Sequence, residues 1–241
     1  KEHVIPLRDS IRSRRFPLFT VLFIAANVLV FLYEVSLSRP ELVAFTMKWG
    51  FTPALLFGSG GATPPAPFGL PGMGGGGAPP ALTLVTSTFI HGGWTHLGMN
   101  MLFLWVFGDN IEDRLGRLKF VVFYVLTGVA ANLAHALASP GADVPVVGAS
   151  GAIAGVLGAY FLGFPRARIT SLIFLGFFVT VTQVPAVVFL IIWFVLQLFM
   201  GLMSYGAAGQ TIAWWAHIGG FATGVVLFLL LGGQRGERVR T

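Results

Sequence analysis

The chain has 241 residues, of which 55% are hydrophobic and only 10% are charged. A soluble domain carries about 25% charged residues, so this composition excludes a soluble globular protein and predicts an integral membrane protein. Without a single cysteine, the chain cannot form disulfides, thiolate metal sites or a cysteine nucleophile. Its net charge of +6 comes from short basic clusters between apolar segments. That pattern indicates membrane topology and predicts no nucleic-acid partner.

Six stretches are long and apolar enough to cross a membrane as helices, which takes about 20 mainly apolar residues. They cover residues 17–36, 94–112, 118–138, 147–164, 184–203 and 212–232. The first is not followed by a cleavage-like site, so we expect it to stay in place as a signal anchor. We therefore predict an all-α polytopic membrane protein with a six-transmembrane-helix bundle at 17–232. A basic cytoplasmic arm at 1–16 would precede the bundle, and a basic cytoplasmic tail at 233–241 would follow it.

Two segments between these helices need a separate interpretation. The long first loop, 37–93, has a Gly- and Pro-rich middle, GSGGATPPAPFGLPGMGGGGAPP, which predicts a mobile loop and excludes a spanning helix. The segment 169–182 is apolar and β-branched but lies too close to the fifth helix to span by itself. We expect it to form an interfacial strand or hairpin.

The basic residues fall almost entirely on one side of the predicted bundle. Thirteen of the 15 flank the first and sixth helices or lie between helices 2 and 3 or 4 and 5, which leaves Arg39 and Lys48 for the other side. Because Lys and Arg favour the cytoplasmic side, both termini are predicted there, which requires an even number of spans. Helices 2, 4 and 6 then all begin at the outer face.

Four polar residues in three of these helices share one predicted depth. His96 and Asn100 lie in helix 2, Ser150 in helix 4 and His217 in helix 6, each within about 10 Å of the outer face. Each alone fits helix packing as well as function, since a membrane serine often bonds its own helix and a histidine can join two helices. Because polar groups inside lipid cost free energy, their convergence favours a functional site.

The chemistry of these residue types predicts an acyl-transfer site. A serine hydroxyl becomes a good nucleophile when a histidine takes its proton, so Ser150 and His217 predict a Ser–His pair. No carboxylate lies at that depth, and we therefore expect a dyad and not a triad. His96 and Asn100, four residues apart on one helix face, would bind the developing oxyanion together with the Ser150 backbone N–H.

Other protease classes lack their sequence signatures here. The chain has no H-E-x-x-H, and His91 and His96 are five residues apart, so no metal site is predicted. The spanning helices hold no aspartate pair, and the Ser150 segment lacks the last glycine of G-x-S-x-G. Six other polar or aromatic residues in or near the predicted helices are interpreted as helix-packing or interfacial groups: Asn27, His135, Gln183, Gln197, Trp214 and Trp215.

Three pieces carry a resemblance: HGGWTHLGMNMLFLWVFGDNIEDRLG, GASGAIAGVLGAY and AHIGGFATG, in helices 2, 4 and 6. With them the chain resembles the rhomboid family of intramembrane serine proteases over residues 18–232. The resemblance implies that Ser150 is the nucleophile and His217 its base, with His96 and Asn100 in the oxyanion hole. It also implies site-shaping or structural roles for Gly148, Gly151, Gly220, Gly224, Glu112 and Arg114.

The resemblance implies a hydrolase that cleaves transmembrane segments of membrane proteins near the outer face of the cell (inner) membrane. Its partners would be transmembrane substrates and membrane lipid, with no cofactor, and the sequence leaves the oligomeric state open. The fifth helix, with Trp193, and the segment 204–212 resemble a lateral gate and cap. Two departures stand out: Gly50 follows Trp49 where many members have Arg, and Ala154 replaces a tyrosine stacked on the histidine in some bacterial members.

Two alternatives to the protease remain open. A rhomboid-like protein would bind transmembrane segments without cutting them, although dead relatives typically lack the serine or the histidine that this chain keeps. A small transporter would use His96 and His217 as proton carriers, but it predicts broken helices or repeated halves, which the sequence lacks.

Overall fold

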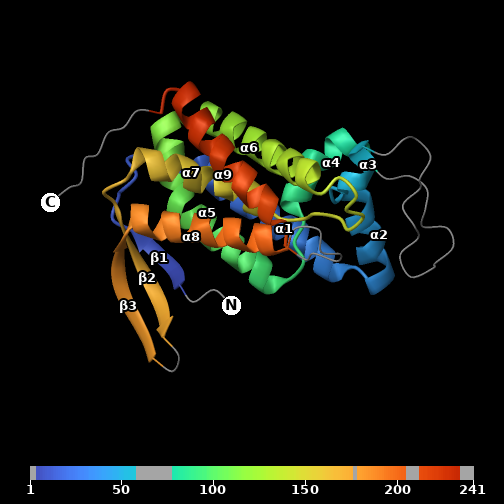
Figure 1. Cartoon of the computed structure of the whole chain (residues 1–241), viewed down its shortest axis with the longest axis horizontal. Coiled ribbons are helices and arrows are strands. Elements are labelled where there is room, and N and C mark those ends of the chain that lie inside the picture. Colours follow the sequence, from blue (N-terminus) through green and yellow to red (C-terminus); the bar gives the residue numbers. More distant parts are fainter. Residues whose placement is uncertain (1–3, 58–77, 176–177, 205–211, 234–241) are drawn as a thin grey trace.

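The computed structural model describes residues 4–57, 78–175, 178–204 and 212–233, and the statements below concern these residues. Each of the six predicted spans corresponds to a helix of the bundle in Figure 1. These helices are α1 (Leu18–Ser36), α5 (Trp94–Leu115), α6 (Arg117–Ala138), α7 (Ser150–Gly163), α8 (Ala186–Met203) and α9 (Trp214–Leu230). By length and composition alone, α1, α6 and α8 can cross a membrane, while α7 and α9 are apolar but shorter.

Helix α7 lies at the centre of the bundle, and its residues 151–160 are all buried. It contacts α5, α6 and α9, and the contact with α9 is made through glycine. A Cβ atom added at Gly220 would collide with the Gly151 carbonyl oxygen, and one added at Gly224 would collide with that of Gly155. Only residues without a side chain allow two membrane helices to approach this closely. The small residues of these two helices therefore fix the distance between them.

A three-stranded antiparallel sheet lies beside the helices, at the end of the bundle where α9 finishes (Figure 1). Its order is β1 (Val4–Asp9), β2 (Arg168–Leu175) and β3 (Phe178–Pro185). The hairpin predicted at 169–182 is confirmed, with Leu172 opposite Val181, and it is slightly longer than expected. Strand β1 was not predicted: part of the basic arm pairs with β2, with Ile5 opposite Leu172.

Short helices fill the described parts of the first loop: α2 (Arg39–Trp49), α3 (Pro53–Phe57), α4 (Pro80–Thr86) and the 3-10 helix η2 (Ser87–Phe89). The start of α2 is capped, because the Glu41 carboxylate accepts the Ser38 backbone N–H at 2.9 Å. Phe51 is fully buried and exchanges two backbone hydrogen bonds with Val146, which joins this loop to the segment before α7. Most of the predicted mobile stretch, 58–77, lies outside the described residues, as do most of the proposed cap and the C-terminal tail.

The two ends of the bundle differ in charge. At one end, the backbone N–H of Arg14 in the N-terminal arm donates to the Asp113 carboxylate in the last turn of α5 (3.3 Å), and the backbone N–H of Arg168 in β2 donates to Ser10 Oγ (2.9 Å). At the same end, Lys119 Nζ in α6 donates to the Leu231 carbonyl oxygen after α9 (2.8 Å). We call this the basic end. Helix α2, with Arg39 and Lys48, lies at the opposite end with α3 and α4 (Figure 1). The charge separation predicted from the sequence therefore follows the long direction of the bundle.

Candidate active site

Ser150 and His217 are in hydrogen-bond contact. Ser150 is the first residue of α7, and His217 lies in the first turn of α9. The Ser150 Oγ atom is 2.8 Å from His217 Nε2, and both side chains are partly buried. With Nε2 unprotonated, the hydroxyl donates to the ring, which is the arrangement in which a histidine can take the serine proton. The glycine contacts between α7 and α9 bring the two residues together.

The backbone before Ser150 has a conformation that favours glycine. Gly148 has a φ of 121°, and its N–H donates to the Ser87 carbonyl oxygen at 2.9 Å. A Cβ atom at this position would lie 2.6 Å from His96 Nε2, so a side chain would also collide with the His96 ring. Gly148 thus lets the chain turn into α7 and leaves room for the His96 ring beside Ser150.

Two hydrogen-bond donors from α5 converge on the same place. His96 Nδ1 accepts the backbone N–H of Gly92 at 3.4 Å, which assigns the ring proton to Nε2, the atom that faces Gly148. Asn100, one turn further along α5, has a buried Nδ2 with no hydrogen-bond partner among the described residues. Buried amides are nearly always paired, so an unpaired one needs an explanation. A group that binds a transient oxyanion is such an explanation.

His91 lies shortly before α5 and is also buried, and neither ring nitrogen has a hydrogen-bond partner among the described residues. Its ring centroid is 5.1 Å from that of His96. Burial, with a smaller contribution from His96, lowers the pKa of His91 to about 4. His91 is therefore neutral at physiological pH and adds no charge beside His96. Among the described residues, no group of three His, Asp or Glu side chains could hold a metal ion.

The His217 ring is held from α8. Gln197 Oε1 lies 2.7 Å from His217 Nδ1. The Trp193 ring centroid is 6.1 Å from that of His217, and the Trp214 ring meets it nearly at right angles at 6.2 Å. Gln197, Trp193 and Trp214 thus hold the His217 ring in place of the stacked tyrosine of some bacterial members. Ala154, which stands at that tyrosine's position, does not contact the ring in this way, because its methyl group faces Gly220. The contact of Gln197 with His217 joins α8 to α9, in agreement with our sequence interpretation of Gln197 as a group that links helices. That interpretation did not identify His217 as the partner, since one glutamine in an apolar helix carries no sign of its partner.

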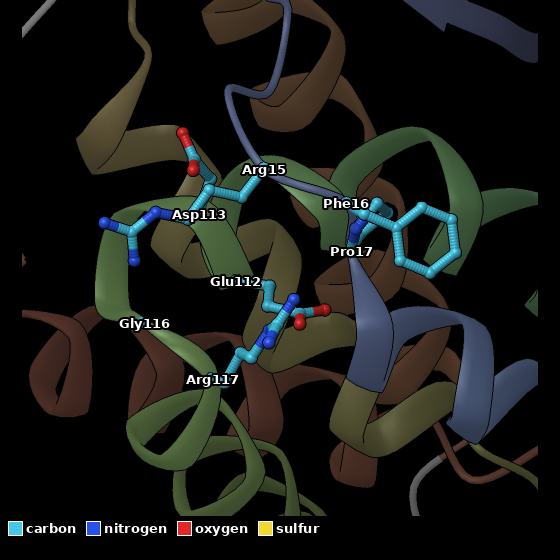
Figure 2. Close-up of a pocket in the computed structure, with 7 residues that line it drawn as sticks. All are labelled: Arg15, Phe16, Pro17, Glu112, Asp113, Gly116 and Arg117. Atoms are coloured by element: carbon cyan, nitrogen blue, oxygen red, sulfur yellow. The ribbon is translucent and has the colours of Figure 1, made fainter.

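Glu112 and Arg114 lie at the basic end, away from Ser150. The Glu112 carboxylate accepts the backbone N–H groups of Phe19 (3.0 Å) and Thr20 (2.8 Å), so it binds the start of α1. The Arg114 guanidinium lies 5.0 Å from the Phe164 ring centroid. Figure 2 shows the pocket at this end, lined by Arg15, Phe16, Pro17, Glu112, Asp113, Gly116 and Arg117. It is remote from the Ser150–His217 contact and takes no part in that chemistry.

Comparison with known proteins identifies the family. The Rhomboid domain model matches residues 80–234, well over half of the chain and all three site-bearing segments. Rhomboid-like protein 11, chloroplastic, of Arabidopsis thaliana is 36% identical over 153 residues, which cover 61% of this chain and 51% of that protein. Rhomboid protein 1, mitochondrial, of Saccharomyces cerevisiae is 32% identical over 154 residues, covering 60% of this chain and 40% of that one.

A bacterial protein is also similar. Putative rhomboid protease YdcA of Bacillus subtilis is 36% identical over 77 residues, covering 32% of this chain and 38% of that protein. In each of these comparisons the match spans about half the relative's length or less. The family match and the helical bundle agree with each other and with the resemblance in the sequence. The chain belongs to the rhomboid family of multi-pass membrane proteins.

Proposed function

We propose that the protein is an intramembrane serine endopeptidase that cleaves transmembrane segments of membrane proteins, with Ser150 as nucleophile and His217 as base. The observation that carries the proposal is the 2.8 Å contact between Ser150 Oγ and His217 Nε2 inside an apolar helical bundle. A serine–histidine contact that served packing alone would not need two further donors, on His96 and Asn100, directed at the same place.

The proposed reaction follows from these contacts. Ser150 Oγ forms a bond to the scissile carbonyl carbon while its proton moves to His217 Nε2. The carbonyl oxygen becomes an oxyanion that accepts hydrogen bonds from His96 Nε2 and Asn100 Nδ2. His217 then gives its proton to the leaving amine, and the C–N bond breaks. Water, deprotonated by the same ring, releases the acyl group and restores the serine.

The substrate must expose a backbone carbonyl to the site. In lipid, an unwound backbone is tolerated only where it lines a polar cavity or is buried in protein. The proposal therefore favours substrates whose helix contains small or weakly helical residues near its end. The site would open to the face opposite the basic end. Some relatives are named chloroplastic or mitochondrial, so the comparisons do not support the inner cell membrane that we expected from the sequence, and an organelle membrane is the location that these names favour.

The decisive experiment is cleavage of a single-span reporter in proteoliposomes by the wild type, Ser150→Ala and His217→Ala, alongside labelling with a fluorophosphonate. Ser36→Ala, an exposed serine that bonds the Tyr33 carbonyl, is the matched control. We expect both site variants to lose at least about 10³-fold in cleavage and to lose labelling, with the control unchanged. If the wild type neither labels nor cuts any of several reporters, the protein is a non-cleaving binder of transmembrane segments.

A further inference from the structure

We infer that Gln197 is a positioning residue: from α8 it fixes the tautomer and the orientation of the His217 ring. The inference rests on the proposed function and deepens it, because it adds a third, uncharged member to the pair predicted from the sequence. The expectation of a dyad considered only carboxylates as third members. An amide oxygen can fill the same position without carrying a charge into the membrane.

The placement of Gln197 is specific. Its side chain is only 8% exposed, whereas its neighbours Val195, Leu196, Leu198 and Phe199 are between 37% and 54% exposed. The lipid-facing surface of α8 is therefore apolar, and the glutamine points inward. Trp193, four residues earlier, lies on the same face and also meets His217. One face of α8 thus presents an aromatic ring and an amide to the candidate base.

The chemistry needs this amide. A neutral imidazole carries one proton, and it acts as a base toward Ser150 only when that proton is on Nδ1 and the lone pair on Nε2. Gln197 Oε1, at 2.7 Å from Nδ1, accepts that proton's hydrogen bond. When Nε2 takes the serine proton, the ring becomes a cation, and the Nδ1–H···Oε1 bond becomes charge-assisted and stronger. The contact therefore supports the ring more in the transition state than in the resting state.

A purely structural role predicts something different. If Gln197 only joined α8 to α9, any substitution at 197 that preserved the packing would preserve activity. Such a substitution would also leave the tautomer of the His217 ring unchanged. A positioning role makes hydrogen-bond acceptance the property that matters. Leucine at 197 has nearly the same size but accepts no hydrogen bond, whereas glutamate keeps the acceptor.

The test compares Gln197→Leu and Gln197→Glu with the wild type, with Gln183→Leu as the control. Gln183 is exposed on β3, shortly before α8, so its replacement makes the same chemical change outside the site. The protein is ¹⁵N-labelled at its five histidines and placed in lipid nanodiscs, and the His217 signal is assigned by its loss in His217→Asn. ¹⁵N shifts report which ring nitrogen carries the proton.

We expect the wild type and Gln197→Glu to hold the proton on Nδ1, and Gln197→Leu to show a mixture of both tautomers. In the cleavage assay, Gln197→Leu should lower kcat by about 10- to 100-fold with KM within about twofold, and Gln197→Glu should recover most of that loss. Unchanged tautomers and kcat in Gln197→Leu would overturn the inference, as would a loss that glutamate does not restore. The tautomer needs no substrate, so this result stands apart from whether the wild type cleaves at all.

Discussion

The two ends of α7 hold polar clusters of opposite character. At the basic end, the Asp9 carboxylate accepts hydrogen bonds from the Tyr160 hydroxyl and from Asn110 Nδ2, so the network is closed within the protein. At the other end, which we call the site end, Asn100 Nδ2 and both ring nitrogens of His91 are buried with no hydrogen-bond partner among the described residues. The same helix thus begins in an unsatisfied cluster and ends in a satisfied one.

The difference distinguishes buried polar groups that stabilise the fold from buried polar groups that serve the proposed function. A buried polar group that serves the fold is paired, because an unpaired one costs about 1–3 kcal/mol. A group that binds a transient charge is kept unpaired until the charge forms, and the rest of the fold must offset that cost. On this view, substitutions of the paired polar groups at the basic end should change stability and leave kcat unchanged. Substitutions of the unpaired polar groups at the site end should change kcat and leave stability unchanged.

Gly220→Val should produce the largest effect, because Gly220 sets the distance between the helices that carry Ser150 and His217. The new Cβ collides with the Gly151 backbone carbonyl, which cannot move aside, so α7 and α9 must separate. We expect fluorophosphonate labelling to disappear and the free energy of unfolding to fall by about 3 kcal/mol or more. Gly98→Val is the control, since a Cβ at exposed Gly98 meets no atom within 4 Å among the described residues, apart from the nearby backbone of its own helix. Labelling that survives in Gly220→Val would show that the site tolerates a wider helix spacing.

Asn100→Ala tests the site end directly. Under the proposed function Asn100 is an oxyanion donor, and the loss of one such donor should lower kcat by about 10²–10³-fold, with KM hardly changed because the charge forms only in the transition state. Since Asn100 Nδ2 has no hydrogen-bond partner in the part of the chain that the structure describes, the melting temperature should not fall. The measurement is cleavage kinetics together with thermal unfolding of the same samples. A lower melting temperature with unchanged kcat would assign Asn100 to the fold and would remove the contrast between the two ends.

The basic end should respond to pH through Asp9. Burial, assisted by Asp109, raises the pKa of Asp9 to about 7 from 3.8. Because the folded state holds this proton more tightly than the unfolded state, the stabilisation is complete below pH 4 and is lost as pH rises to 7. We expect the free energy of unfolding to fall by no more than about 3 kcal/mol between pH 5 and pH 7.

Asp9→Asn should flatten this dependence, and Asp143→Asn, in an exposed loop, should not. The measurement is the melting temperature from pH 5 to pH 9 in one detergent. A wild-type curve that rises with pH over this range would contradict the assigned direction. In either case kcat measured at one fixed pH should be the same for Asp9→Asn and the wild type, because the group lies at the end of α7 away from Ser150.

The sequence was sufficient for the six helices of the bundle and for the approach of Ser150 to His217, because both depend on local patterns. Apolar length marks each span, and small residues at regular spacing mark the contact between α7 and α9. Strand β1 was missed, since Ile5 meets Leu172 far along the chain and the arm's basic residues obscure a short apolar strand. Helix α2 could have been found, because Ser38, Pro40 and Glu41 form a recognisable helix start. The contact of Gln197 with His217 could not have been predicted, since it depends on the rotation of α8 about its own axis.

The smallest effect is expected for Tyr160→Phe, which removes one donor from the closed network and leaves the ring in place. Tyr160 is fully buried, and its hydroxyl donates to Asp9. The loss should lower the free energy of unfolding by about 1 kcal/mol, with kcat within about twofold of the wild type. Tyr124→Phe is a matched control, because the Tyr124 hydroxyl is buried with no hydrogen-bond partner among the described residues, so its removal should be neutral or slightly stabilising. Equal destabilisation by the two changes would mean that packing around the rings, and not the bond to Asp9, holds the basic end together.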